Sequence, residues 1–526
     1  MIALTRKFIS RSQTLGFGAP IETWDNSDKS TFLSTDGSIE SLVGAANKRC
    51  AAFSNEQREL LVSCLTKQYG SLTKSEQLKK NIQLLANEHS VTITTGHQLT
   101  LGLGPLFLIY KALHVINACD RLNQLNTTYN FIPVFWLASE DHDFKEVQST
   151  NFFKKTHTWE SDQTGPVGQF NTIGLKEIHE VICSFFNPAE LAEIHQLFQV
   201  TDTNYAGQIR CMLNTLFGAY GLVIIDGDDR ELKRAFAPLI KRELTEHFIH
   251  EEVQKTNEQL IAQGKTIQAH VRPINLFYLS SGNRARIIPN DHGYTADNLQ
   301  WKTDELLEEL NKYPERFSPN VLFRPIYQEL ILPNICYVGG GGEMAYWSQL
   351  KSAFNHVGVP FPSLQTRVSA FILPTSANTE DIEAYFSPIQ DQINQLLTKQ
   401  SNRDELFAQI DETFEQLTTQ LKRGIQHFNG DASKWCGAQL TGISSNVTNY
   451  KQRWQKEEKQ LLDSQIKRIE RIHQELYPNA IPQERYNNIL HFCGKYGIHS
   501  WISALKSQID PFSIDIHIFT QSNETE

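Results

Sequence analysis

The chain has 526 residues, of which 40% are hydrophobic and 21% charged, the ordinary balance of a soluble globular protein with two or three domains. It contains no apolar run of about 18 residues and no hydrophobic leader, so we expect a cytoplasmic protein without a membrane partner. The net charge of −10, with no block rich in Lys and Arg, disfavours nucleic acid as a partner. Eight scattered cysteines without a CxxC pair indicate reduced thiols and argue against a metal site of the usual zinc spacing.

Residues 1–90 carry mostly helical patterns, including Thr73-x-x-Glu76, which is typical of a capping box before a helix. Residues 91–375 alternate strand-like and helix-like segments, and this alternation predicts an α/β fold with a mainly parallel sheet. Weaker periodicity at about 145–215 and 240–320 indicates insertions into the sheet domain. We therefore predict one core domain over residues 1–375.

The segment from Val91 to Phe144 predicts the ligand crevice of such a sheet. Val91–Thr94 is a β-branched run typical of a buried strand, and Phe131–Ala138 predicts the next strand. Between them lie a loop with three glycines and a helix that we expect Pro105 to open, because proline suits a first helical turn. Open α/β sheets bind ligands beyond the carboxyl ends of their strands.

The loop that follows the first of these strands is a candidate nucleotide site. Backbone N–H groups around Thr95, Gly96 and Gly104, together with the start of the helix, favour a phosphate. His97 is positioned to donate a hydrogen bond to developing charge on a phosphate, and Lys111 to add a cation. The glycines follow no Walker or GxGxxG spacing, so a tight turn with Lys111 on a solvated helix face is the alternative.

Four ionisable residues, Glu140 to Asp143, follow the second strand directly. Alternation of side chains sends some of them into the crevice and others away from it. We predict that Asp141, His142 and Asp143 are catalytic and that Glu140 binds substrate, because carboxylates hold an ammonium group, accept its proton or bind Mg²⁺. The alternative is a solvated loop in which an aspartate caps the next helix.

A third candidate element is the glycine run Gly339–Gly342, which precedes Glu343 and Tyr346. Four glycines let the backbone approach a ligand closely, at a cost in entropy that a simple turn does not require. We predict that Gly341, Gly342, Glu343 and Tyr346 bind substrate. In the alternative, Glu343 only balances a helix dipole and the aromatic residues belong to the core.

Two single basic residues near predicted strand ends complete the candidate site. Arg324 is a candidate for binding substrate, and Arg367 a candidate for binding the nucleotide. An ion pair at the surface is the commoner role of such residues and is the alternative for each.

From residue 376 the pattern changes to heptad-spaced apolar residues. One run covers Phe407–Phe428, Asn429-Gly430-Asp431 breaks it, and a second run covers Leu440–Leu476. This predicts an antiparallel coiled-coil hairpin over residues 376–480 that also forms a homodimer. A pair of ordinary packed helices is the alternative. Residues 481–526 are expected to pack back on the core.

In order along the chain, these elements resemble the bacillithiol biosynthesis cysteine-adding enzymes, also called cysteine ligases. The resemblance extends over essentially the whole chain, and the block after Pro133-Val134-Phe135-Trp136 is its most specific part. The matching pieces are Thr95-Gly96-His97-Gln98, Gly104-Pro105-Leu106, Glu140-Asp141-His142-Asp143-Phe144, Arg324-Pro325 and Gly342-Glu343-Met344-Ala345-Tyr346-Trp347. The sequence departs from the family at His97, where glutamine is commoner, and at Leu103, where threonine is.

The resemblance implies a Rossmann-type core related to class I aminoacyl-tRNA synthetases, with connecting-peptide insertions and a C-terminal coiled coil. It implies an amide-forming ligase that adds cysteine to glucosaminyl malate in the last step of bacillithiol synthesis. ATP, with Mg²⁺ as a further candidate, would activate the carboxylate as an acyl-adenylate, by analogy with the synthetases. On this reading Asp141 and Asp143 hold or deprotonate amines, and Glu343 lines the second substrate.

Two other functions fit the residues. One is a metal-dependent hydrolase with ligands from Glu140 to Asp143, which needs a further distant ligand, since four consecutive residues cannot all reach one ion. The other is a non-catalytic nucleotide-binding protein that uses the hairpin for assembly.

Overall fold

A computed structural model describes residues 2–70, 72–125, 127–200, 204–380, 382–400, 403–426, 430–494 and 496–521. The chain divides into two compact units. The first comprises Met1–Arg11, Phe17–Ile372 and Gln483–Glu526, and the second comprises Ser12–Gly16 and Leu373–Pro482. Phe428 and Asn429, at the break predicted between the two heptad runs, lie outside the described residues.

The first unit is built on a five-stranded parallel sheet, which confirms the predicted sheet class. Its strands are β2 (Ser90–His97), β3 (Asn130–Leu137), β6 (Val223–Asp226), β13 (Asn334–Gly339) and β14 (Ser363–Thr366). Their order across the sheet is β14-β13-β2-β3-β6, and every neighbouring pair is parallel. Along the chain, β2, β3 and β6 follow one another toward one edge of the sheet, and β13 and β14 then follow toward the other edge. The order reverses between β2 and β13, which is the switch point where open sheets bind ligands.

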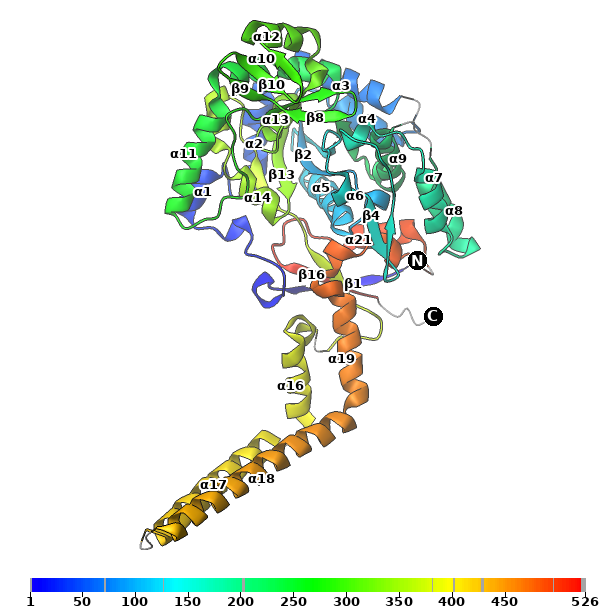
Figure 1. The fold of residues 1–526 in the computed structure, drawn as a ribbon. Helices are drawn as coiled ribbons and strands as arrows, with labels where there is room; N and C mark the ends of the chain where they lie inside the picture. Colours follow the sequence, from blue (N-terminus) through cyan, green and yellow to red (C-terminus); the bar gives the residue numbers. More distant parts are fainter. Residues whose placement is uncertain are drawn as a thin grey trace. The chain divides into compact units, whose positions relative to one another are not determined.

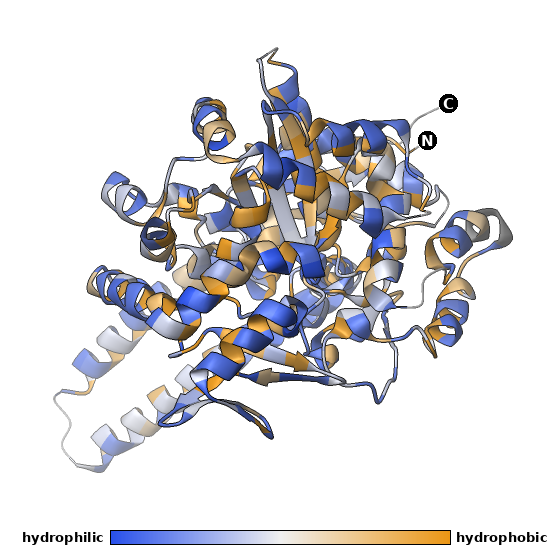
Figure 2. Ribbon diagram, turned by 90° about the horizontal axis from the view of Figure 1, so that it is seen from above, coloured by the Kyte–Doolittle hydropathy of each residue, from blue (hydrophilic) through white to orange (hydrophobic). Residues whose placement is uncertain are grey.

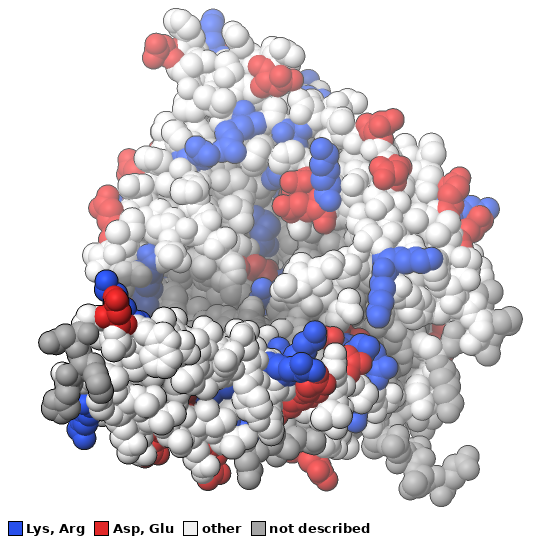
Figure 3. Space-filling view, turned by 60° about the horizontal axis from the view of Figure 1, so that its bottom comes forward, with Lys and Arg blue, Asp and Glu red and all other residues white. Residues whose placement is uncertain are grey.

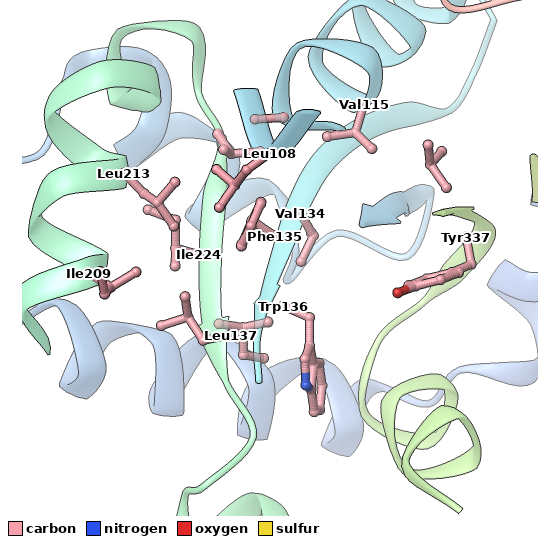
Figure 4. Close-up of a cluster of buried hydrophobic side chains, with 14 of the residues drawn as sticks. Leu108, Val115, Val134, Phe135, Trp136, Leu137, Ile209, Leu213, Ile224 and Tyr337 are labelled. Carbon is pink, nitrogen blue, oxygen red and sulfur yellow. The ribbon is translucent and has the colours of Figure 1, made fainter. Parts of the chain in front are cut away.

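The strands combine apolar and β-branched residues, and they are buried on both faces. All residues of β3 after Asn130 are buried. Figure 4 shows side chains of α5 (Phe107–Asn123), α9 (Tyr205–Phe217) and β6 gathered around this strand. The residues drawn there include Leu108, Val115, Ile209, Leu213 and Ile224, each at most 2% exposed.

Helices cover both faces of the sheet, and surface helices show hydrophilic and hydrophobic sides in Figure 2. The remaining α-helices of this unit are α1 (Asn26–Phe32), α2 (Ile39–Ala52), α3 (Asn55–Tyr69), α4 (Glu76–Leu84), α6 (Phe144–Val147), α7 (Leu175–Cys183), α8 (Pro188–Phe198), α10 (Arg230–Glu246), α11 (Phe248–Ala262), α12 (Thr303–Lys312), α13 (Arg324–Ile331), α14 (Gly341–Trp347), α15 (Lys351–Val357), α20 (Gln483–Tyr486) and α21 (Ile498–Gln508). Figure 1 shows their arrangement.

Smaller sheets surround the central one. Strands near the two ends of the described chain pair in a sheet of order β1-β16-β15. In it β1 (Leu4–Ile9) is antiparallel and β15 (Ala370–Ile372) is parallel to β16 (Ile516–Gln521). Near the candidate site, β7 (Leu276–Ser280) pairs with β8 (Asn283–Arg286) and β12 (Phe317–Pro319). The others are β4 (Ser149–Phe152) with β5 (Lys155–Thr158), and β10 (Gly293–Ala296) between β9 (Ile288–Asn290) and β11 (Leu299–Trp301).

The second unit is helical in its described residues. Its α-helices are α16 (Ile389–Gln400), α17 (Arg403–Gly424), α18 (Asp431–Leu461) and α19 (Asp463–Leu476). Ion pairs join Arg403 to Glu458 and Lys451 to Asp411, so α17 and α18 run antiparallel, as predicted. No helix in the described part of the chain has the length and apolar character needed to cross a membrane.

Three local predictions were wrong in their boundaries. The ladder between β2 and β3 continues to the pair His97–Leu137, so Gly96 and His97 belong to the strand and not to a loop. Helix α5 begins at Phe107, two residues after Pro105. Helix α4 is capped by Ser75, whose hydroxyl accepts a hydrogen bond from the N–H of Leu78, so Thr73 opens no capping box.

A buried carboxyl group in α13 makes the stability of the core depend on pH. Glu329 is 0% exposed and accepts hydrogen bonds from the amides of Gln328 and Asn334. Burial raises its pKa to about 7, although the charge of Arg49 opposes this shift. In the unfolded chain a glutamate titrates near about 4.3. Between these values the folded protein holds a proton that the unfolded chain has released, so stability from this group falls as pH rises.

We therefore expect Glu329→Gln to stabilise the protein relative to the wild type by an amount that grows from pH 5 to pH 7.5. Urea unfolding at several pH values measures this difference. The exposed Glu308→Gln is the matched control and should show a constant difference. Parallel stability curves for Glu329→Gln and the wild type would contradict the assignment.

Candidate active site

A cavity of about 920 Å³ lies at the carboxyl ends of the central strands. Its walls include the ends of β2, β3 and β13 and the residue after β14, so it spans the switch point. Figure 3 shows a hollow on one face of the molecule with Lys and Arg side chains along its wall. Eleven of the predicted site residues line the cavity: Gly96, His97, Lys111, Glu140, Asp141, Arg324, Gly341, Gly342, Glu343, Tyr346 and Arg367.

Lys111 and Glu343 form a buried ion pair in the wall of this cavity. Their Nζ and Oε2 atoms are 2.5 Å apart, and Lys111 also donates to the carbonyl of Gly96 at 2.8 Å. Glu343 accepts further hydrogen bonds from the hydroxyl of Tyr337 and the N–H of Gly340. Burial alone would raise the pKa of Glu343, but Lys111 and these donors outweigh it and lower the pKa to about 2. Lys111 is thus 1% exposed and neutralised by a carboxylate, and its helix face is not solvated.

His97, the last residue of β2, presents a neutral imidazole to the cavity. Burial, together with the nearby charge of Lys111, lowers its pKa to about 3. Its Nε2 atom is buried and has no hydrogen-bond partner among the described residues. The preceding Gly96 is required by close strand packing, because a Cβ there would lie 3.0 Å from the carbonyl oxygen of Trp136.

The four ionisable residues after β3 differ in their contacts and in whether they line the cavity. Glu140 forms an ion pair of 2.6 Å with Lys233, which is 0% exposed and equally close to Asp228. Asp141 accepts hydrogen bonds from the side chain of Gln98 and from the N–H of the next residue, each at 2.7 Å. Its side chain remains 33% exposed. Glu140 is therefore neutralised in the wall, whereas Asp141 has no Lys or Arg partner in the described structure.

His142 and Asp143, both predicted to be catalytic, lie outside the cavity lining. The Nδ1 atom of His142 is 3.2 Å from a guanidinium nitrogen of Arg284. Asp143 occupies the position before α6 without a side-chain capping bond. Because β3 ends at Leu137, these residues already belong to the turn that leads into α6. In the described parts of the chain, no three His, Cys, Asp or Glu side chains are grouped closely enough to hold a metal ion.

Two residues predicted to bind the nucleotide have structural contacts instead. The hydroxyl of Thr95 donates to the carbonyl of Val338 at 2.8 Å and joins β2 to β13. A Cβ at Gly104 would lie 2.7 Å from the hydroxyl of Thr150 and 2.8 Å from the amide of Asn488. Neither residue lines the cavity.

Several arginines that the sequence patterns did not indicate line the cavity. Seven lining residues are Lys or Arg and three are Asp or Glu. The arginines with no ion pair in the described structure are Arg272, Arg284, Arg286, Arg324 and Arg485. Arg284 donates to the hydroxyl of Ser318 and the carbonyl of Pro319, and its guanidinium lies 4.1 Å from the ring centroid of Phe277. This excess of positive charge suits a ligand with several negative groups.

Two family models match this chain, and both describe domains of the same protein family. Residues 38–368 match the family model described as "Bacillithiol biosynthesis BshC, N-terminal Rossmann-like domain". Residues 378–521 match "Bacillithiol biosynthesis BshC, C-terminal coiled-coil domain".

Full-length relatives agree with these models. A protein of Flavobacterium johnsoniae is 37% identical over 92% of this chain and 93% of its own length. Proteins of Christiangramia forsetii and Cytophaga hutchinsonii are each 34% identical, over 95% and 88% of this chain and 96% and 88% of their own lengths. All three carry the name "Putative cysteine ligase BshC".

Removal of the buried cation should destabilise the fold. We expect Lys111→Met to lower the free energy of unfolding by about 3 kcal/mol, because it leaves the Glu343 carboxylate without its charge partner. The double variant Lys111→Met/Glu343→Gln should recover part of that loss, which denaturant unfolding measures. Lys79→Met, which removes an exposed pair with Glu76, is the control and should change stability by at most about 0.5 kcal/mol. Equal losses in the single and double variants would contradict a coupled pair.

Proposed function

The chain belongs to the bacillithiol biosynthesis BshC family, and from that premise we propose that it is a ligase that joins the carboxyl group of L-cysteine to the amine of glucosaminyl malate. This forms an amide and is the last step of bacillithiol synthesis. The observation that carries the proposal is the cavity at the switch point, which combines arginines without ion pairs with one carboxylate, Asp141, that has no Lys or Arg partner among the described residues.

The cavity matches the charges of these substrates. Glucosaminyl malate carries two carboxylates and an amine, and cysteine carries a carboxylate and an amine. Arginine is suited to carboxylates and phosphates because its planar donors bind them in pairs. Asp141 supplies the opposite charge for an ammonium group.

The same residues fit ATP as the activating substrate. The arginines of the β7–β8 wall would hold phosphates, and a Cβ at Gly341 would meet nothing within 4 Å, so the space beside the backbone there is open. Mg²⁺ would be bound chiefly by the phosphates, because Glu140 and Glu343 are already paired with lysines.

The proposed reaction has two steps, activation of the cysteine carboxylate and attack by the amine. A free carboxylate does not condense with an amine until one of its oxygens is part of a good leaving group. Transfer of a phosphoryl or adenylyl group from ATP to that oxygen achieves this and releases ADP or pyrophosphate. The amine then attacks the acyl carbon, the C–N bond forms and the bond to the leaving group breaks. Asp141 accepts the proton that the amine loses. The neutral His97 is available to donate a hydrogen bond near the phosphates.

Activity with defined substrates tests the proposal. Purified full-length protein with cysteine, glucosaminyl malate, ATP and Mg²⁺ should form bacillithiol, which mass spectrometry detects together with AMP or ADP. We expect Asp141→Asn to lower kcat by about 100-fold or more, because the amine loses its general base. Asp143→Asn, two residues away and outside the cavity, is the matched control and should retain kcat within a few-fold.

Failure of the wild type to form bacillithiol under these conditions would reject the ligase assignment. Equal activity of the two aspartate variants would reject Asp141 as the base while leaving the ligase assignment in place.

The proposal includes a homodimer formed through α17 and α18. In this helix pair α17 has no buried residue, and large apolar side chains remain exposed on α18. Tyr450 is 51% exposed, Trp454 38% and Leu461 84%. These residues follow one another at intervals of four and seven, so they lie on one side of α18. A second copy of the helix pair would remove this apolar stripe from water.

We expect light scattering to give twice the chain mass of 60.1 kDa at micromolar concentration. Tyr450→Glu/Trp454→Glu should shift the protein to the single-chain mass without unfolding it, because both side chains are already solvent-exposed. Gln452→Glu/Gln455→Glu introduces the same charges elsewhere on α18 and should remain dimeric. A wild type that elutes at the single-chain mass would contradict this assembly.

A further inference from the structure

A second, smaller cavity adjoins the main one. It measures about 170 Å³ and shares four lining residues with the large cavity, namely Gly340, Gly341, Arg367 and Arg485. Its other walls come from the segment between Arg11 and Trp24 and from α14. The two cavities therefore meet at these four residues.

The lining of the small cavity is positively charged. Three of its residues are arginines, Arg11, Arg367 and Arg485, and none of the lining residues is acidic. Arg367 is used by the fold, because it donates to Glu484 at 2.6 Å and to the carbonyl of Val368 at 2.9 Å. Arg11 is likewise committed, through bonds to the carbonyls of Ile514 and Arg367.

Arg485 differs from these two. Its guanidinium lies 5.3 Å from the ring centroid of Phe17, and it forms neither a hydrogen bond nor an ion pair with any described residue. Partial burial lowers its pKa, and the charge of Arg367 adds to this effect while Glu484 opposes it. Glu484 is 0% exposed and also accepts the N–H of Ala370, so it is held inside the fold. Arg485 is solvent-exposed at the cavity, close to the charge of Arg367, so an anion bound there would supply a counterion that the described residues do not.

We propose that Arg485, supported by Arg11 and Arg367, forms an anion subsite that binds a negatively charged group of one of the substrates. The proposal rests on the ligase function given above. Both carboxylates of the malyl group and phosphates of the nucleotide have the required chemistry. The subsite gives the segment after the coiled-coil hairpin, Gln483–Tyr486, a direct role in substrate binding.

Steady-state kinetics of the full-length protein test this subsite. We expect Arg485→Gln to raise KM for one anionic substrate tenfold or more while kcat changes by less than about twofold, because the group that reacts is bound elsewhere. Arg485→Lys should recover part of the loss, since it keeps the charge but not the paired donors. Arg121→Gln, an exposed arginine that lines neither cavity, is the control and should leave both KM values unchanged.

Comparison of KM for the two substrates identifies which anionic group the subsite binds. A raised KM for glucosaminyl malate alone assigns the subsite to the malyl carboxylates, and a raised KM for ATP alone assigns it to phosphates. Unchanged KM values for both substrates in Arg485→Gln would overturn the proposal.

Direct binding separates this proposal from the ligase assignment. Calorimetric titration with malate and with pyrophosphate should show binding to the wild type that weakens tenfold or more in Arg485→Gln. If the wild type makes no bacillithiol yet binds either probe in this Arg485-dependent way, the ligase assignment fails and the subsite remains. If bacillithiol forms but Arg485→Gln binds both probes as the wild type does, the subsite fails and the ligase assignment remains.

Discussion

The ion pair between Lys111 and Glu343 joins the two halves of the sheet where the strand order reverses. Lys111 lies on the helix that follows β2, and Glu343 lies on the helix that follows β13. The lysine also donates a hydrogen bond to the carbonyl of Gly96, and the glutamate accepts hydrogen bonds from Tyr337 and Gly340. The ion pair therefore links the ends of β2 and β13 to the helices that follow them. A buried charge is tolerated only when its partner and hydrogen bonds are in place. The wall of the cavity therefore depends on this pair.

The remaining charges of the cavity follow a common scheme. Glu140 and Glu343 are neutralised by buried lysines, whereas five arginines in the lining have no carboxylate partner in the described structure. The cavity is thus positive inside a chain whose net charge is −10. Cations that line a cavity attract small anions, because the low-dielectric walls focus the electric field of the cations. This arrangement suits metabolites with carboxylates or phosphates, and it does not require the basic outer surface that a nucleic acid would need.

Local patterns predicted the elements of the site better than the contacts of its residues. Strands β2 and β3 were predicted because one contains a β-branched run and the other is a continuous apolar run, and the polar residues after them follow from where such strands end. The burial of Lys111 was not predicted, because helical periodicity places a lysine on a polar face unless a partner from elsewhere in the chain neutralises it. His142 and Asp143 were placed in the cavity because the exact end of β3 is not encoded in the alternation of its residues.

The sequence by itself determined the sheet class, the antiparallel helix pair, the family and the three segments that meet at the cavity. Each of these depends on periodicity or on motifs within a few tens of residues. Only the tertiary structure decided which charges are neutralised and which remain available, as for Lys233 beside Glu140 or Arg485 beside Phe17. Those pairings join residues about 90 to 470 positions apart, and no local spacing records them, because an ion pair depends on distance in space and on burial.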